Sequence, residues 1–168
     1  MSLSMYEASA PTFASMLRNL DAILVKTQAH AAARKIDPTV LLNARLFPDM
    51  YPLLRQVQIA TDQAKGCVAR LAGVEVPRYE DSEQSFADIR QRLAKTIAFV
   101  ESIAPAQFDG SEERDIALKV GGRELSFKGK PYLVGFVLPN FYFHLVTAYN
   151  ILRHNGVEIG KRDFTGEI

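Results

Sequence analysis

The longest apolar stretch of the sequence, residues 130–155, constrains the fold more than any other feature. It reads KPYLVGFVLPNFYFHLVTAYNILRHN, and its apolar residues recur with helical spacing. Gly156 follows directly, in the position of a glycine that ends a helix. We therefore expect a last helix over residues 130–155, kinked at Pro139, and an extended tail over residues 157–168.

Three earlier segments, residues 6–34, 51–72 and 83–103, have the spacing of amphipathic helices. Their inward-facing residues are Phe13, Met16, Leu17, Leu20, Ile23 and Leu24 in the first, Leu54, Val57, Thr61, Ala64, Val68 and Leu71 in the second, and Phe86, Ile89, Leu93, Ile97 and Val100 in the third. Asp81 or Ser82 can cap the third helix. Four long helices in 168 residues predict an all-α four-helix bundle that forms a single domain over residues 1–168.

One β signal lies between the third and the last of these helices. The segments DIALKV and RELSF alternate apolar and polar residues and are joined by Gly121-Gly122, a two-residue turn. In that register Leu118 lies opposite Leu125 and Ile116 opposite Phe127, so that all four side chains share one face. We expect a small β-hairpin inserted before the last helix.

Composition and charge exclude several classes of protein. The net charge of +1 gives no electrostatic reason to expect a nucleic acid or an anionic membrane as partner. Residues 133–152 are too polar for a membrane span, since Asn140 and His144 would be costly in lipid. The N-terminus lacks the pattern of a signal peptide. The single cysteine, Cys67, suits a reducing compartment, and we expect a cytoplasmic protein.

The polar residues with a potential chemical role are few. Asn140 and His144 are four residues apart and project from one helix face, and Gln58 lies on the apolar stripe of the second predicted helix. Such a cluster can be a buried hydrogen-bonded layer, the wall of a small-molecule pocket, or a metal site with His144 as ligand, although one histidine and two amides form a poor transition-metal site. Asn43 and Arg45 either line the mouth of such a pocket or only connect helices.

The last predicted helix carries more aromatic residues than one buried face can hold. They are Phe136, Phe141, Tyr142, Phe143 and Tyr149. An excess of this kind is typical of a core face combined with a subunit interface, and we expect a homodimer.

The segments SMYEASAPTFASML, KIDPTVLLNARLFPDMYPLLRQVQIATDQAKG and LPNFYFHLVTAYNILRHNGVEIGKRDF resemble a bacterial family of unknown function in the DinB/YfiT-like superfamily. The resemblance covers essentially the whole chain and implies the four-helix bundle fold. It also implies a divalent metal held by three histidines, one on the second helix and two, four apart, on the fourth. The L-R-x-x-G-V ending places Asn140 and His144 at the paired positions and Gln58 at the remaining one, so that one ligand of three is kept.

Better-characterised members of that superfamily include metal-dependent thiol transferases and a thiol-dependent isomerase. Three functions therefore stay open for this chain. The first is a helical-bundle protein with a degenerate metal site and a small-molecule pocket, without assignable catalysis or cofactor. The second is a metal-dependent thiol transferase or hydrolase that uses His144 with zinc, nickel or manganese and a reduced ligand set. The third is a structural dimerisation module.

Overall fold

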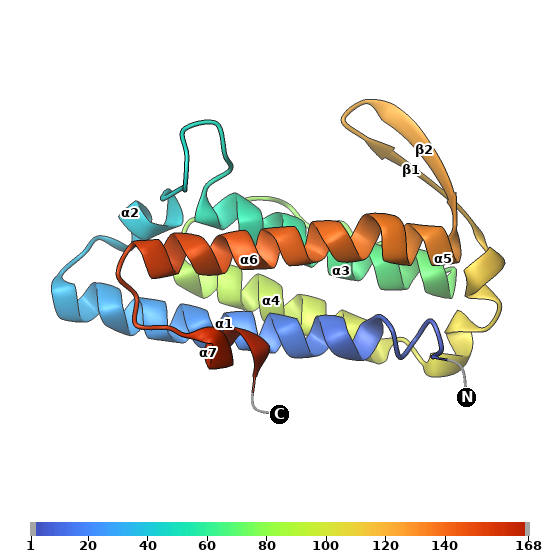
Figure 1. Cartoon of the computed structure of the whole chain (residues 1–168), viewed down its shortest axis with the longest axis horizontal. Helices are drawn as coiled ribbons and strands as arrows, with labels where there is room; N and C mark the ends of the chain where they lie inside the picture. Colours follow the sequence, from blue (N-terminus) through green and yellow to red (C-terminus); the bar gives the residue numbers. More distant parts are fainter. Residues whose placement is uncertain (1–2, 167–168) are drawn as a thin grey trace.

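The computed structural model describes residues 3–166, which form a mostly helical fold with one two-stranded sheet (Figure 1). The α-helices are α1 (Ala10–Arg34), α2 (Pro38–Leu42), α3 (Leu53–Ala72), α4 (Phe86–Ser102), α5 (Gly129–Pro131), α6 (Leu138–His154) and α7 (Lys161–Thr165). Within residues 3–166 there are thus seven α-helices, so the count of a four-helix bundle is not confirmed; α1, α3, α4 and α6 are the long ones. We call these four the helical body.

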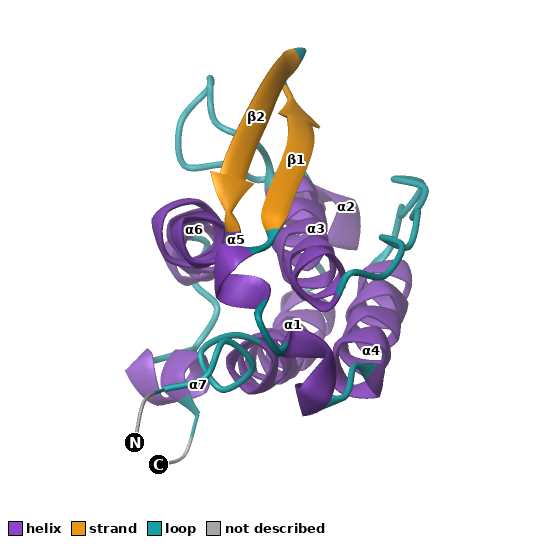
Figure 2. Cartoon of the chain, turned by 90° about the vertical axis from the view of Figure 1, so that its right-hand side faces the viewer, coloured by secondary structure: helices purple, strands orange, loops and turns teal. Residues whose placement is uncertain are grey.

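The four long helices lie side by side, with α3 between α4 and α6 (Figures 1 and 2). The most extensive contact between helices is that of α3 with α6, followed by that of α1 with α4. In the core, the rings of Phe13 and Phe141 meet edge to face with centroids 4.7 Å apart. Because α3 has a neighbour on each side, its polar residues Gln56 and Gln58 are both buried.

Local capping explains two helix boundaries. Asp37 caps α2 by accepting a hydrogen bond from the backbone N–H of Thr39, as its position before Pro38 predicts. Ser85 and Asp88 form a capping box at the start of α4. The predicted caps, Asp81 and Ser82, are therefore wrong, and α4 begins at Phe86.

The last predicted helix consists of three successive segments. Residues 129–131 form α5, Tyr132–Val137 are π-helical, and α6 follows. Pro139 lies in the first turn of α6, directly after the π-helical stretch, so it donates no N–H to the preceding turn, where the helix is irregular. No helix within residues 3–166 is both long enough and apolar enough to span a membrane.

The hairpin of β1 (Asp115–Val120) and β2 (Arg123–Lys128) has the predicted register, which confirms that part of the prediction. Its turn, Gly121-Gly122, has positive φ at both positions, a conformation that favours glycine. The hairpin extends away from the helical body (Figures 1 and 2), and near its base Phe127 packs against Tyr132 and Phe136.

The C-terminal segment is helical where an extended tail was expected. Residues 161–165 form α7, which packs against α1. The amide of Asn19 donates a hydrogen bond to the carbonyl of Phe164, and Lys26 pairs with Asp163 at 2.6 Å. Residues 157–160 and 166 have no regular structure, and the last two residues of the predicted tail, 167 and 168, lie outside the described residues.

Candidate functional site

His144 on α6 is buried against α3. Its Nδ1 atom lies 2.6 Å from Oε1 of Gln56, and the ring of Phe143 packs edge-on against the imidazole with centroids 5.3 Å apart. The sequence pattern pointed to Gln58 on this helix, but the partner is Gln56. Residues two positions apart in a helix point in directions that differ by about 200°. Gln56 therefore faces α6, and Gln58 faces the other side, where it contacts Glu83 in the connection to α4.

A chain of hydrogen bonds determines which nitrogen of His144 carries the proton. Nε2 of Gln56 donates to the carbonyl oxygen of Tyr51 at 3.0 Å, which leaves Oε1 of Gln56 directed at His144. An amide oxygen can only accept, so Nδ1 of His144 is the donor. In the neutral imidazole Nε2 therefore keeps its lone pair. Nε2 has no hydrogen-bond partner among residues 3–166 and retains access to solvent.

The environment of His144 favours this neutral form. Burial, and after it the positive charge of Arg55, lower the pKa of His144 below its ordinary value of 6.5. At neutral pH the imidazole is therefore an acceptor at Nε2 and a donor at Nδ1.

The lowered pKa makes stability dependent on pH with a defined sign. Below about pH 6.5 the unfolded chain binds the His144 proton more readily than the folded protein, so that acid favours unfolding. The contribution of neutral His144 to the free energy of unfolding is fully present above that pH, and it is lost as the pH falls through the lowered pKa of the folded protein. Thermal unfolding of the wild type and His144→Gln between about pH 7.5 and pH 5 measures it. We expect the wild type to lose more stability, and equal losses would contradict the assignment.

The two other residues of the predicted cluster have partners of their own. Gln58 accepts a hydrogen bond from Arg55 at 3.1 Å and donates one to Glu83 at 2.8 Å. The amide of Asn140 donates to the carbonyl of Phe136, within the irregular stretch before α6, at 2.6 Å. The structure thus does not join Gln58 or Asn140 to His144 by a hydrogen bond, which speaks against a shared layer among the three alternatives that the sequence leaves open.

Asn43 and Arg45 shape the segment between α2 and α3. Asn43 follows α2, and its amide donates to a carbonyl one turn earlier. The guanidinium of Arg45 lies 3.4 Å from the carbonyl oxygens of both Pro48 and Met50, and it borders an open cavity of about 480 Å³ formed by residues 45–48. Both residues hold the loop in shape, and their place at a ligand pocket stays a prediction.

The side chains present do not fit the three-histidine metal site that the resemblance implies. Oε1 of Gln56 is directed at the Nδ1 proton of His144, and Oε1 of Gln58 accepts from Arg55. Within residues 3–166 no three histidine, cysteine, aspartate or glutamate side chains are grouped so that they could hold a metal ion. A single imidazole is left as a strong donor, which is too few for a structural or catalytic transition-metal site.

A second polar cluster, centred on Arg92 of α4, is more deeply buried. The Arg92 side chain is only 2% exposed. It contacts Thr61, Asp62, the carbonyl of Glu80, Asp81 and Glu83, at distances of 2.7 to 3.3 Å. These contacts hold the connection between α3 and α4 against both helices.

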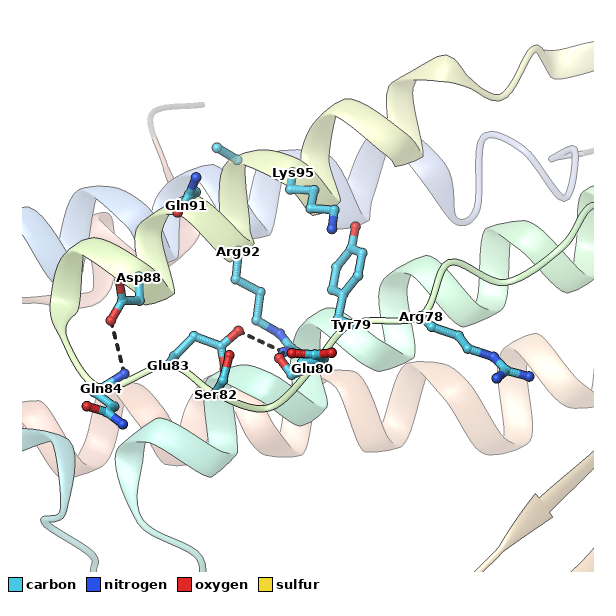
Figure 3. A pocket seen from close by; sticks show the side chains of 11 residues that line it. Arg78, Tyr79, Glu80, Ser82, Glu83, Gln84, Asp88, Gln91, Arg92 and Lys95 are labelled. Atoms are coloured by element: carbon cyan, nitrogen blue, oxygen red, sulfur yellow. Dashed lines mark hydrogen bonds and ion pairs between the residues drawn. The ribbon is translucent and has the colours of Figure 1, made fainter.

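The same connection borders a cavity of about 910 Å³ (Figure 3). It is lined by Arg78, Tyr79, Glu80, Ser82, Glu83, Gln84, Asp88, Gln91, Arg92, Ala94 and Lys95. Figure 3 shows Arg92 reaching to Glu83, and Lys95 beside the ring of Tyr79. The ammonium of Lys95 lies 4.2 Å from the Tyr79 ring centroid, a cation–π contact. Charged residues that line the cavity, such as Arg92, Glu83 and Lys95, are therefore engaged in contacts that hold the connection between α3 and α4 in place.

Sequence patterns missed both Gln56 and Arg92, although each left a signal. Arg92 lies three residues after Ile89 and next to Leu93, on the apolar stripe predicted for its helix. A charged residue at such a position indicates a buried ion pair. For Gln56 the signal is weaker, since two glutamines two residues apart in RQVQ leave open which one faces the last helix.

The arrangement of the long helices and the hairpin is that of a DinB-like protein. The crystal structure of a DinB family member protein from Shewanella denitrificans superposes with a TM-score of 0.89 at 42% sequence identity, covering 98% of this chain and 93% of that chain. Residues 5–165 match the domain of unknown function DUF1993, and the chain belongs to this family. Both findings confirm the resemblance found in the sequence. No curated protein matches the chain significantly.

Proposed function

We propose that this DUF1993 protein binds a small molecule at His144 without the aid of a metal ion. The observation that carries the proposal is the chain from the Tyr51 carbonyl through Gln56 to His144. It presents an unprotonated Nε2 whose direction is fixed by two helices, as a preorganised binding group requires.

The neighbouring side chains indicate the chemistry of the ligand. Nε2 of His144 accepts a hydrogen bond, so the ligand carries an N–H or O–H group. Phe143, whose ring packs edge-on against the imidazole, is 55% exposed. An exposed aromatic ring next to a polar acceptor suits a small molecule with one donor group and an apolar part.

The proposal includes no reaction. A neutral histidine can accept a proton, but in the described part of the chain no nucleophile or second acid is hydrogen-bonded to His144. Cys67 does not supply a nucleophile, because it is fully buried and burial raises the pKa of its thiol. A cytoplasmic location remains part of the proposal, in keeping with a single reduced cysteine.

Thermal-shift screening of a small-molecule library tests the proposal, with His144→Ala as the site variant. His154→Ala is the matched control, since this exposed histidine lies at the end of the same helix. We expect compounds that raise the melting temperature of the wild type and of His154→Ala but not of His144→Ala. Compounds that stabilise all three proteins equally would show that binding lies elsewhere.

Calorimetric titration with zinc, nickel and manganese tests the alternative of a metal-dependent transferase or hydrolase. We expect no stoichiometric binding that depends on His144, since only one strong donor is available. One equivalent of metal bound by the wild type and lost in His144→Ala would favour the enzyme.

The predicted homodimer also belongs to this proposal. Three apolar side chains of α6, those of Tyr142, Phe143 and Val146, are exposed, which suits an apolar contact with a partner. A protein that dimerises and binds none of the compounds would favour the third alternative, a structural dimerisation module.

A further inference from the structure

The β-hairpin has more exposed surface than a two-stranded element usually tolerates. Of its twelve strand residues only Ile116 is buried, and the hairpin extends away from the helical body (Figure 2). Isolated two-stranded hairpins are at best marginally stable in water, and an additional strand is a common source of stability. The hairpin therefore has room for a further strand on either edge.

The outer edge of β2 presents an unpaired row of backbone groups. In a two-residue turn the pair that flanks the turn, Val120 and Arg123, is hydrogen-bonded, and the bonding alternates along the ladder. The N–H and C=O groups of Glu124, Ser126 and Lys128 are thereby directed away from β1. Within residues 3–166 the backbone groups of Glu124 and Ser126 have no partner outside the strands. Lys128 is the N-cap of α5, so its C=O belongs to the start of that helix and its N–H is the group that it offers at the edge. Such an edge is a template for a further strand.

The charges along β2 identify the strand that fits. Glu124 and Lys128 lie two residues before and after Ser126, on the same face. In an antiparallel pair of two β2 strands centred on Ser126, each Glu124 lies opposite Lys128 of the partner subunit. The same register places Leu125 opposite Phe127 of the partner subunit, on the apolar face. A strand of this sequence is thus complementary to itself.

We propose that two copies of this chain associate through the edges of β2, around a two-fold axis at Ser126, to form a four-stranded antiparallel sheet. In this sheet charges alternate across the strands, because Lys128 also pairs with Asp115 of its own hairpin at 2.7 Å. The inference does not depend on ligand binding at His144. It places the contact of the homodimer at the β2 edge, as the alternative to a contact through the exposed side chains of α6, and a dimer that Ser126→Pro leaves unchanged would favour α6.

β2 is preferred over β1 because its apolar residues are more accessible. β1 could pair with itself around Ala117, with Asp115 opposite Lys119 of the partner subunit. That register places Ile116 opposite Leu118 of the partner subunit, but Ile116 is buried and has little surface to offer. Leu125 and Phe127 of β2 are both partly exposed, so pairing through β2, on the α6 side of the hairpin (Figure 2), gives the apolar cross-strand contacts of a symmetric interface.

Two matched proline variants test the proposal. Ser126→Pro removes an N–H of the β2 edge, and Ala117→Pro removes its counterpart on the β1 edge, since Ala117 and Ser126 are cross-strand partners and both are exposed. Neither change removes a bond of the hairpin ladder. By sedimentation velocity we expect a dimer for the wild type and Ala117→Pro, and dimer dissociation at least about tenfold stronger for Ser126→Pro.

Three results of the proline experiment would overturn the proposal. They are a wild type that is monomeric at every accessible concentration, a dimer broken by Ala117→Pro and kept by Ser126→Pro, and a dimer that both variants keep. Circular dichroism of each variant establishes that the helical content is unchanged.

A charge-reversal pair tests the register. Glu124→Lys and Lys128→Glu each place like charges opposite one another in the proposed dimer, so that each variant alone is expected to dissociate more than the wild type. In an equimolar mixture both contacts are restored, and we expect a heterodimer at least about tenfold tighter than either homodimer. A mixture no tighter than its components would exclude this register.

Discussion

Replacing Arg92 by methionine is expected to lower the free energy of unfolding by about 3 kcal/mol. Methionine keeps most of the apolar stem and removes a guanidinium that is 2% exposed and contacts three carboxylates. The loss leaves Glu83, which is only 10% exposed, without its cation. Asp62 and Asp81 keep Lys65 and Arg55 as partners, so the uncompensated charge falls mainly on Glu83.

Arg90→Met is the matched control for this experiment. Arg90 lies on the same helix and pairs with Asp21 at 2.7 and 3.1 Å, but both side chains are about one third exposed. Exposed pairs contribute little, and we expect at most about 1 kcal/mol for this change. Urea denaturation of both variants measures the difference. Equal losses would show that the Arg92 contacts stabilise the fold no more than a surface pair does.

The same substitution should loosen the connection between α3 and α4 before the helices unfold. Residues 74–85 contain no helix or strand and are held by Arg92 and by the contact of Tyr79 with three cations. In Arg92→Met, limited proteolysis is expected to cut within these residues under native conditions. If Arg92→Met resists proteolysis as well as the wild type does, the contacts of Arg92 are not what holds residues 74–85 in place.

The parts of the fold that follow from local rules could be predicted from the sequence. The hairpin register follows from alternation and from the turn Gly121-Gly122, both of which involve neighbouring residues. The α3 stripe was predicted well at Val57, Ala64 and Val68 for the same reason, since helical spacing is a local property.

The candidate site could be predicted only in part, because it depends on how helices pack. His144 was identified from its place on the last helix, but its partner depends on which side of α3 faces α6. Because α3 is buried on both sides, both Gln56 and Gln58 lie on a buried face of the helix. The sequence therefore does not show which of the two glutamines contacts His144. Asn140 lies on α6 with His144, but its amide donates to the carbonyl of Phe136 in the irregular stretch before α6, and helical spacing alone does not reveal that a carbonyl is available there.

Arg92 shows a second limit of sequence patterns. Its partners Asp81 and Glu83 come from a connection without regular structure, whose path over the helices no periodicity describes. A buried arginine is stable only when that path brings carboxylates to it. The position of Arg92 on an apolar stripe therefore indicates that partners exist but not where they lie.

The hairpin and the helical body meet at Gly129, where space for a side chain is absent. A Cβ atom at this position would lie 1.8 Å from the carbonyl oxygen and 2.9 Å from the carbonyl carbon of Ser111, and 3.2 Å from Leu71. The first two are backbone atoms, which cannot rotate away as a side chain can. The close approach thus requires glycine for steric reasons.

Gly129→Ala is expected to destabilise the protein by roughly 3–5 kcal/mol, because the backbone of Ser111 has to move to accept a methyl group. Gly135→Ala is the control, since nothing lies within 4 Å of a Cβ atom there and the residue is exposed in the stretch that leads to α6. Alanine favours helix over glycine, so this variant should be as stable as the wild type or more stable. The midpoints of thermal and urea unfolding measure both. A Gly129→Ala protein as stable as Gly135→Ala would mean that the segment before β1 can shift freely, and the hairpin would then lack the fixed base that pairing through β2 needs.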